Sequence, residues 1–366
     1  MASVAPAPYR PETVSPPGKT IADMLEDLGM SQAELARRLG RPSNKLNQII
    51  KGTKAITADT ALELESVLGL PASFWLNREQ NYRLALSERE RLERQTENAE
   101  IVRNFPYAEM ARHGWVQQHT SRVEKYRELL RFFAVAGNQP LEHTLDRVRN
   151  CVGELAPSFR KSKIREANPE ALAAWLRQCT HEAQQIDVAE FDKATVRASL
   201  EEFRALTLQP FADVTRQLPQ LAAKFGIRVV FVPHLQKTYV GGAAFWAGGS
   251  PVIGLTFRYK TNDWIWFNFF HELGHILLHS PKHTWLDDFS DDQESHEVEA
   301  NEFAANTLIP ADAYAKFLSE GRRSKAAVRT FARKIGIAPG IVVGRLQKFD
   351  GLPPSHLNGL KERLEV

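Results

Sequence analysis

The spacing of apolar and polar residues divides the chain into four segments. Residues 1–19 are Pro-rich and polar and show no helical or strand period. Residues 20–86 form short apolar repeats with helical spacing, separated by glycines, and residues 87–210 form longer helical repeats rich in Arg, Glu, Ala and Leu. From residue 211 a β-branched run and Gly-rich turns appear before further helices. We therefore predict a multidomain, mainly α protein with a disordered N-terminal arm (1–19), a helical bundle (20–86), a helical linker region (87–210) and an α+β domain (211–366).

The segment 20–86 begins with three short helices. The apolar residues of "TIADMLEDLGM" share one helix face. In "SQAELARRLG", Ser31 is expected to cap the helix, with Glu34 three residues later as the second half of a capping box. The stretch "RPSNKLNQIIKG" is expected to begin at a cap formed by Ser43. Two short helices joined by a few residues indicate a helix-turn-helix, whose second helix enters the major groove of DNA.

The polar face of this second helix is the candidate DNA-reading surface. Amide side chains suit adenine, and Lys suits guanine or phosphate. With one arginine from the preceding helix, the candidate DNA-binding residues are Arg38, Asn44, Lys45, Asn47, Gln48 and Lys51. A small helical bundle with a solvated basic face would show the same pattern, so the periodicity alone leaves both interpretations open.

Composition restricts the class of protein and its compartment but does not indicate a function. The 366 residues are 43% hydrophobic and contain no apolar run long enough for a transmembrane helix, so no membrane partner is expected. The net charge of +3 is too small to indicate a partner. Cys151 and Cys179 show no CxxC spacing, which favours free thiols in a reducing compartment. We therefore expect a cytoplasmic protein.

In the last segment, the pattern predicts a small sheet with a helix packed on it. "LPQLAAKFG" reads as a helix that ends at Gly226, and "IRVVFVPHL" as a strand. "GGAAFWAGGSPVIGLTFRYK" reads as a pair of strands with Gly-rich turns. "TNDWIWFNFFHELGHILLHS" then reads as a helix capped by Thr261 or Asn262.

This helix carries the candidate chemistry. Residues four apart lie on one helix face, so His271 and His275 can direct their imidazoles at one metal ion. Glu272 lies beside them and can reach a metal-bound water, which is the HExxH arrangement of zinc hydrolases. Glu272 is then the candidate catalytic base and zinc the expected cofactor. The alternative is a core helix with two hydrogen-bonded histidines, because HExxH also occurs by chance.

A catalytic zinc usually has three protein ligands, so a third should follow. In "ESHEVEANEFAANTLIP" we expect Glu297 as that ligand, in the order Glu-x-x-Ala-Asn. Glu299 is the rival, about 200° further around the helix. His279 faces the same side as His275, and a packing or supporting role suits it better than ligation.

Both ends of the chain resemble known families. The stretch from Met30 to Arg83, with "LARRLG", "IIKG" and "ITADTALELESVLGLPASFWLN", is similar to the Xre-type helix-turn-helix of HigA-like antitoxins. "GGAAFWAGGSPVIGLTFRYKTNDWIWFNFFHELGHILLH", "EVEANEFAANTLIP", "FARKIGIAPGIVVGRLQ" and "LNGLK" resemble the ImmA/IrrE metallopeptidases. This resemblance implies a zincin-like, gluzincin-type fold, with zinc on His271, His275 and Glu297 and Glu272 as catalyst. Asn301 stands where related zincins often carry an Asp that orients a ligating His.

Two functions remain at this stage. The first is a DNA-binding regulator with zinc-dependent endopeptidase activity that cleaves a protein partner such as a transcriptional repressor. The second is a HigA-like antitoxin that binds operator DNA and a toxin, with a structural or sensory zinc site. The expected partners are operator DNA and a protein substrate or toxin, and we also consider a homodimer. The intact set of His271, Glu272, His275 and Glu297 favours the first function, because a structural site does not need Glu272.

Overall fold

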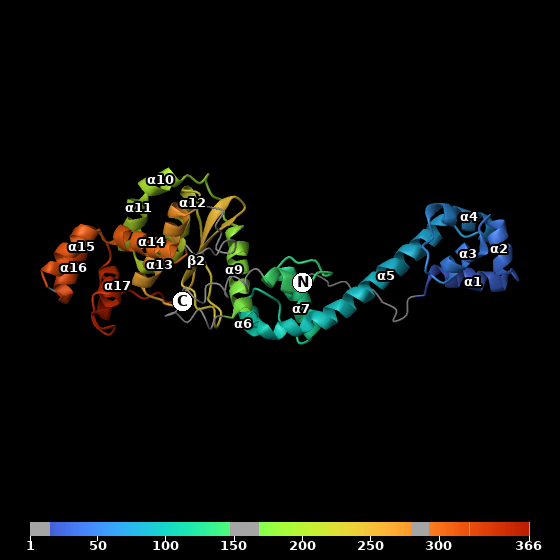
Figure 1. Cartoon of the computed structure of the whole chain (residues 1–366), viewed down its shortest axis with the longest axis horizontal. Helices are drawn as coiled ribbons and strands as arrows, with labels where there is room; N and C mark the ends of the chain where they lie inside the picture. Colours follow the sequence, from blue (N-terminus) through green and yellow to red (C-terminus); the bar gives the residue numbers. More distant parts are fainter. Residues whose placement is uncertain (1–14, 147–167, 280–292, 322, 366) are drawn as a thin grey trace, which may run out of the picture. The chain divides into compact units, whose positions relative to one another are not determined.

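The computed structural model describes residues 15–146, 168–279, 293–321 and 323–365 (Figure 1). The chain divides into two compact units, residues 1–97 and 98–366. The division falls at the end of α5 (Ala72–Asn98), a long helix that contains the boundary predicted at residue 86. Most of the predicted arm, up to residue 14, lies outside the described residues, as does Cys151. Helix α1 (Pro17–Asp27) begins at Pro17, so the arm ends earlier than predicted.

In the first unit, helices surround one small core. The helices before α5 are α1, α2 (Gln32–Arg38), α3 (Ser43–Ile50) and α4 (Ala58–Leu68). The Ser31 half of the predicted capping box is confirmed, because Ser31 Oγ accepts the Glu34 N–H at 3.1 Å, whereas the Glu34 carboxylate accepts bonds from Arg37 and Arg38. The cap predicted at Ser43 is wrong: Pro42 holds the cap position of α3 and Ser43 is already helical. The core of this unit contains Ile21, Leu35, Leu46, Ile49, Leu64 and Trp75, each at most 1% exposed.

The second unit is mainly helical around a small sheet. Before the sheet it contains η1 (Ala99–Asn104), α6 (Tyr107–Arg112), α7 (Arg122–Phe132), α9 (Pro169–Ala183), α10 (Lys193–Ala198), α11 (Leu200–Ala205), η3 (Leu206–Leu208), η4 (Phe211–Asp213) and α12 (Val214–Lys224). After the sheet it contains α13 (Asn262–Leu278), α14 (Gln293–Leu308), α15 (Ala311–Ser319), α16 (Lys325–Ile335), α17 (Pro339–Phe349) and η5 (Asn358–Leu360). None of the helices in the described residues is both long enough and apolar enough to span a membrane.

The sheet has three strands in the order β1-β3-β2. The strands are β1 (Arg228–Phe231), β2 (Gly242–Ala247) and β3 (Ser250–Leu255). β1 is parallel to β3, with Val229 opposite Ile253, and β2 is antiparallel to β3, with Ala244 opposite the same Ile253. The three strands and α13 were predicted from the sequence. Because β2 is the last strand in this order, its outer edge pairs with no other strand of the described residues.

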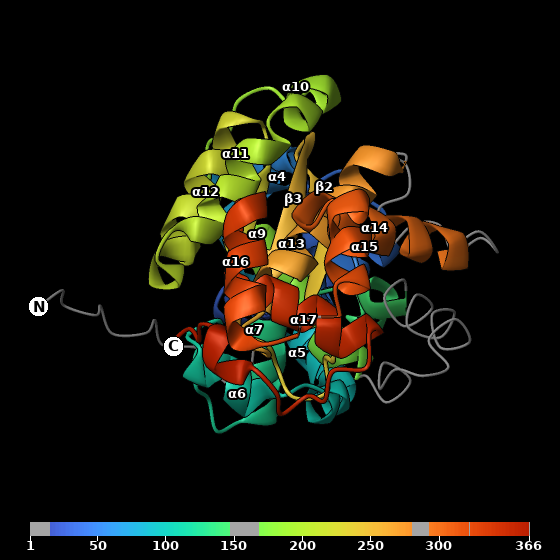
Figure 2. The same ribbon diagram turned by 90° about the vertical axis from the view of Figure 1, so that its left-hand side faces the viewer.

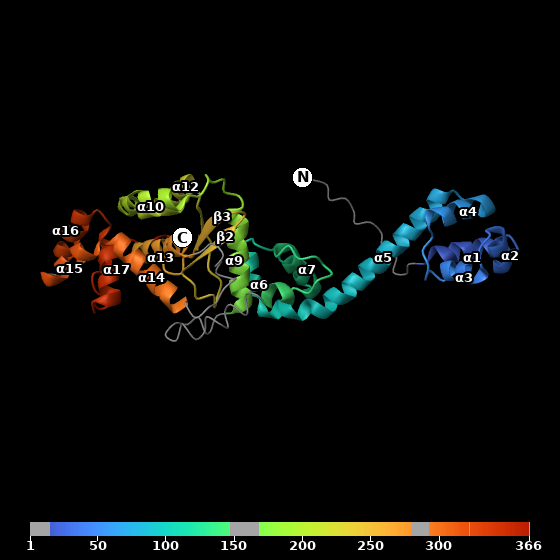
Figure 3. The same ribbon diagram turned by 45° about the horizontal axis from the view of Figure 1, so that its top comes forward.

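The two faces of the sheet are buried in different cores. Successive side chains of a strand point to opposite faces. Val229 and Ile253 accordingly belong to the core that contains α13, whereas their neighbours Val230 and Val252 belong to the core that contains α9. Figure 2 shows α13 lying across β2 and β3, and Figure 3 shows the strands between α13 and α9. The sheet is therefore the middle layer of the second unit.

Helix α9 belongs to a segment that the sequence suggested was a linker region. In the structure this helix packs directly on the sheet. A Cβ atom on Gly254 would lie 2.8 Å from Cys179 Sγ, and the Trp175 indole N–H donates to the Val232 carbonyl at 3.3 Å. The described part of this segment therefore lies in the same compact unit as the sheet. Helix α9 covers one face of the sheet, whereas Val196 and Phe203 belong to the core on the other face.

The beginning of α13 is held by the C-terminal segment of the chain. The Asn262 N–H donates to the Glu362 carbonyl at 3.0 Å, and Asn262 Oδ1 accepts the Glu362 N–H at 3.2 Å. Lys361 Nζ forms an ion pair with Asp263 Oδ2 at 2.6 Å. The helix start was predicted correctly, but Thr261 at the N-cap position makes no side-chain cap bond. The Asn262 side chain, the other predicted cap, accepts the backbone N–H of Asp263 at 3.0 Å, so Asn262 bonds both the first turn and the C-terminal segment.

Candidate metal centre

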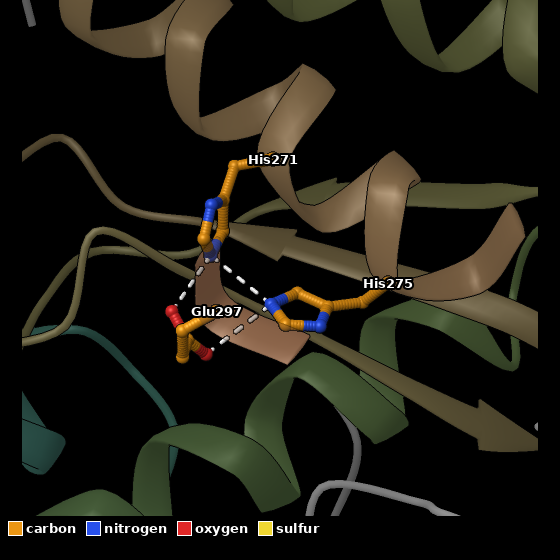
Figure 4. A group of neighbouring side chains, drawn as sticks. All are labelled: His271, His275 and Glu297. Atoms are coloured by element: carbon orange, nitrogen blue, oxygen red, sulfur yellow. Dashed lines mark hydrogen bonds and ion pairs between the residues drawn. The ribbon is translucent and has the colours of Figure 1, made fainter. Parts of the chain in front are cut away.

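Three side chains from two helices meet at one point beside the sheet. His271 and His275 lie one turn apart on α13, and Glu297 reaches them from α14 (Figure 4). The two Nε2 atoms are 3.1 Å apart. Glu297 Oε2 is 3.4 Å from His271 Nε2, and Glu297 Oε1 is 3.3 Å from His275 Nε2. The structure thus brings together the three residues that the sequence suggested as ligands.

This donor set fits a zinc ion. Ligand atoms at about 2.0–2.1 Å from a tetrahedral centre lie about 3.3 Å from one another. The observed separations of 3.1–3.4 Å are close to that spacing, with a different carboxylate oxygen of Glu297 facing each histidine. In the residues that the structure describes, this is the one group of at least three His, Cys, Asp or Glu side chains arranged to hold a metal. Although burial acts to raise the pKa of Glu297, hydrogen bonds from the two imidazoles lower it, so the carboxylate is ready to ligate.

Helix α14 can approach α13 because position 274 is a glycine. A Cβ atom on Gly274 would lie 3.0 Å from the ring of Phe303 and 3.3 Å from the Cα atom of Ala300. Ala300 lies three residues after Glu297 on α14 and is fully buried. The absence of a side chain at Gly274 therefore lets the two helices approach closely, which places Glu297 within reach of both histidines.

Glu272 lies next to the three donors without joining them. Its side chain is 6% exposed and points to strand β2, where the Ala244 backbone N–H donates to its carboxylate. Its Oε2 atom has no hydrogen-bond partner in the described part of the chain. Burial raises the pKa of Glu272 to about 8, and a bound dication would lower it again by attraction. An oxygen without a partner in such a place is available to accept a proton from a water molecule.

His279 and Glu299 extend a chain of contacts from the donor residue His275. His279 Nδ1 lies 3.1 Å from His275 Nδ1, and Glu299 Oε2 lies 3.3 Å from His279 Nε2. Glu299 therefore contacts His279 and not the ring of either His271 or His275, which agrees with its place on another side of α14. Supporting hydrogen bonds of this kind fix the ring orientation of a metal-binding histidine.

Asn301 does not play the role expected from the resemblance. Its Nδ2 donates to the carbonyl of Glu297 within the same helix at 2.6 Å, so its side chain is used locally. His271 Nδ1, the atom that such an orienting residue would hold, is buried without a hydrogen-bond partner among the described residues. Asn301 therefore does not orient a ligating histidine in this structure, unlike the Asp that related zincins often carry at this position.

Sequence reasoning also missed how β2 positions Glu272. A Cβ atom on Gly242 would lie 3.0 Å from Glu272 Oε1, and one on Gly241 would lie 2.5 Å from Nδ2 of Asn268. The two glycines therefore let α13 lie close to the edge strand. The signal in the sequence was the Gly-Gly pair before "AAFWA", which had been interpreted only as a turn.

In the first unit, the candidate DNA-contacting side chains are all exposed. Asn44, Lys45, Asn47 and Gln48 are exposed on α3, while Leu46 and Ile49 of the same helix are buried. Lys51 is exposed at the end of this helix. Arg38 is exposed on α2 and donates to Glu34 at 2.8 Å. The same carboxylate accepts bonds from Arg37, and together these bonds lower the pKa of Glu34.

Comparisons with known proteins find a different family in each of the two units. Residues 21–75 match the helix-turn-helix family, and residues 222–347 match the peptidase family described as the IrrE N-terminal-like domain. Virulence-associated protein I of Dichelobacter nodosus is 34% identical over 76 residues, which are 20% of this chain and 70% of that protein.

Two solved structures are each similar to about a fifth of the chain. An addiction module antidote protein of the HigA family from Coxiella burnetii is 37% identical, with 20% of this chain and 82% of that chain covered and a TM-score of 0.20. The Pseudomonas aeruginosa antitoxin HigA, solved with the higBA promoter, is 32% identical, with 20% and 83% covered and a TM-score of 0.20. The chain therefore carries an IrrE-like peptidase-family domain at residues 222–347 and an N-terminal helix-turn-helix domain at residues 21–75.

Proposed function

We propose that this protein is a DNA-binding regulator whose second unit is a zinc-dependent endopeptidase that cleaves a protein partner, such as a transcriptional repressor. The observation that carries the proposal is the position of Glu272. It lies beside the cluster of His271, His275 and Glu297, it packs on the edge strand β2 at Gly242, and one of its oxygens has no partner in the described residues. A site that only held a metal for stability would gain nothing from burying this carboxylate.

With zinc bound, the residues of this site would supply the groups that peptide hydrolysis needs. His271, His275 and Glu297 would hold zinc, which supplies a water with a pKa near 7 and polarises the carbonyl of the substrate. Glu272 would accept the proton of that water as it attacks, and would pass the proton to the amine that leaves. The outer edge of β2 would align the substrate, because an extended peptide can add to an exposed strand through backbone hydrogen bonds. This last contact explains why the substrate would be a polypeptide.

The first unit would direct this activity to DNA. The exposed polar face of α3 has the amide and ammonium groups that read adenine, guanine and phosphate in a major groove. The HigA protein of Pseudomonas aeruginosa was solved with its promoter, and a comparable use of α3 here would bring the peptidase to proteins bound at an operator.

The decisive experiment compares cells that carry the native protein, Glu272→Gln or Glu302→Gln. Glu302 is exposed on α14, so its replacement removes the same charge without touching the site. Sequencing of new protein N-termini should show a cleavage product in the native and Glu302→Gln cells and its absence with Glu272→Gln. The removal of a positioned acid–base group should lower the rate by at least about 100-fold.

The same variants test the competing function. If Glu272→Gln leaves every cleavage product and every regulatory phenotype unchanged, then the peptidase proposal is wrong. The protein would in that case act as a HigA-like repressor and antitoxin with a structural or sensory zinc. Purified Glu272→Gln should retain zinc, because the three proposed ligands remain, and this control shows that the loss of cleavage is not a loss of metal.

A further inference from the structure

A cavity lies away from the metal centre in the second unit. It has a volume of about 350 Å³ and lies between α13, the end of α14, α17 and the segment after α17. None of His271, Glu272, His275 and Glu297 lines it. Its apolar walls include Trp264, Phe267, Leu308, Ile309, Ile341 and Phe349. The volume is at the lower end of the range of small-molecule sites, about 300–1,000 Å³.

Three cationic side chains line this cavity, and two of them already bind acceptors within the protein. Arg345 donates to the carbonyls of Ala305 and Ile309 at 2.7 and 2.8 Å, where it completes the end of α14. Lys361 is paired with Asp263 at 2.6 Å. Each of these two cations therefore already has its acceptors within the protein.

The third cation, Lys348, has no carboxylate partner within ion-pair distance in the described part of the chain. Its Nζ lies 4.4 Å from the ring centre of Phe267 and 5.3 Å from that of Phe349. Burial by the side chains around it lowers the pKa of this ammonium group, although the residue as a whole remains exposed. Lys348 thus offers one positive charge beside an apolar cavity.

The mouth of the cavity exposes aromatic surface. Trp264 is 38% exposed and Phe349 is 58% exposed, and both are large apolar side chains that gain free energy when a ligand covers them. An apolar interior, an aromatic mouth and one available cation together match a ligand with an apolar body and a single negative charge. A phosphate or a sugar would leave its polar groups without partners against these walls.

We propose that this cavity binds a small aliphatic monocarboxylate. Its chain would fill the space between α13, α14 and α17, and its carboxylate would lie at the mouth and accept hydrogen bonds from Lys348. The bound chain would contact Phe267, whose ring stacks on the ring of His271 at a centroid distance of 6.3 Å. The site is therefore one aromatic ring away from the metal centre without sharing a residue with it.

The test measures binding of decanoate to the full-length protein by calorimetry, with 1-decanol as the neutral probe of the same length. Decanoate should bind at one site per chain, at least roughly tenfold more tightly than 1-decanol, because a hydrogen bond to a charged group adds to the apolar contact. Lys348→Met should lower the affinity for decanoate to that of 1-decanol and leave 1-decanol unchanged. Lys334→Met, which removes an exposed lysine from α16, should bind both probes as the native protein does.

A second variant fills the cavity. Ala305 lines the wall, and Ala305→Phe should abolish the binding of both probes. The proposal is overturned if the native protein shows no saturable binding of decanoate, if Lys348→Met binds decanoate as tightly as the native protein, or if folded Ala305→Phe keeps its affinity. If Ala305→Phe does not fold, the comparison of the two probes with Lys348→Met decides the question. Calorimetry does not depend on proteolysis, so this result is separate from the fate of the peptidase proposal.

Discussion

The carboxylate of Glu272 packs so closely on Gly242 that a Cβ atom at position 242 would lie 3.0 Å from Glu272 Oε1. The same Cβ atom would lie 3.1 Å from the carbonyl oxygen of Gly254 on the neighbouring strand, so it could not avoid Glu272 by moving toward β3. Glycine at this position therefore provides space rather than an unusual backbone angle. The backbone of β2 at Gly242 and the side chain of Glu272, the proposed base, therefore lie in close contact with no room for a larger residue at position 242.

Gly242→Ala should move the Glu272 carboxylate by a few tenths of an ångström and leave the three donor residues in place. Because a displacement of about 1 Å can cost about 100-fold in rate, we expect a loss of roughly tenfold in proteolysis. Zinc content should not change. Gly359→Ala is the matched control, since its Cβ atom would meet nothing within 4 Å. Cleavage by Gly242→Ala at the native rate would show that the fit between Gly242 and Glu272 has no part in the reaction.

The purified protein should contain about one zinc ion per chain, because three protein ligands and a water complete a site. His271→Ala and Glu297→Ala should each lose the metal. Glu299→Ala should weaken zinc binding by no more than about 10–100-fold, since Glu299 acts only through His279. Metal analysis after dialysis measures all three variants. Equal zinc in the native protein and in Glu297→Ala would remove Glu297 from the ligand set.

The sequence predicted the site better than its surroundings. The helical period of α13 predicts that His271 and His275 share one face. The order Glu-x-x-Ala-Asn on α14 singled out Glu297 as the third ligand. Both predictions depend only on residues within one helix. Asn301 also shares a face with Glu297, but its short amide bonds the Glu297 carbonyl of its own helix. A helical pattern gives the direction of a side chain and does not decide which of two nearby acceptors it uses.

The role of residues 98–210 could not be read from the sequence for a different reason. Ten of the fifteen residues of α9 are buried, including Glu170 and Gln178, so this helix has no clear polar face. Its partner is the sheet that begins at Arg228, far along the chain. Local periodicity indicates that a helix will be buried, but contact between Cys179 and Gly254 depends on the fold as a whole.

Replacement of Gln48 tests whether α3 reads DNA. If the exposed amide of Gln48 binds a base edge, Gln48→Ala should weaken binding at the cognate operator by about 1–3 kcal/mol and leave non-specific binding nearly unchanged. The triple replacement of Lys45, Asn47 and Gln48 by alanine should abolish specific binding. A mobility shift with operator and unrelated duplexes measures both effects. Unchanged specific binding by the triple variant would exclude α3 as the reading helix.

The final prediction concerns Glu34, which pairs with both Arg37 and Arg38 on α2. A carboxylate that holds two arginines competes with DNA phosphates for them. Glu34→Gln keeps the helix cap, because Ser31 Oγ accepts the backbone N–H of residue 34 and not its side chain. The freed guanidinium groups should raise the affinity for all duplexes alike, and the salt dependence should become steeper by up to about 0.9 in log–log slope for each new phosphate contact.

Two controls separate this effect from a change in net charge. Glu26→Gln removes the same charge from an exposed position on α1 and should leave the salt dependence as it is. Arg38→Ala added to Glu34→Gln should reverse most of the gain, because Arg38 is the arginine we assign to a phosphate. If Glu34→Gln binds operator and unrelated DNA with the native affinity and the native salt slope, Arg38 does not contact the DNA backbone, and the interface lies on α3 without it.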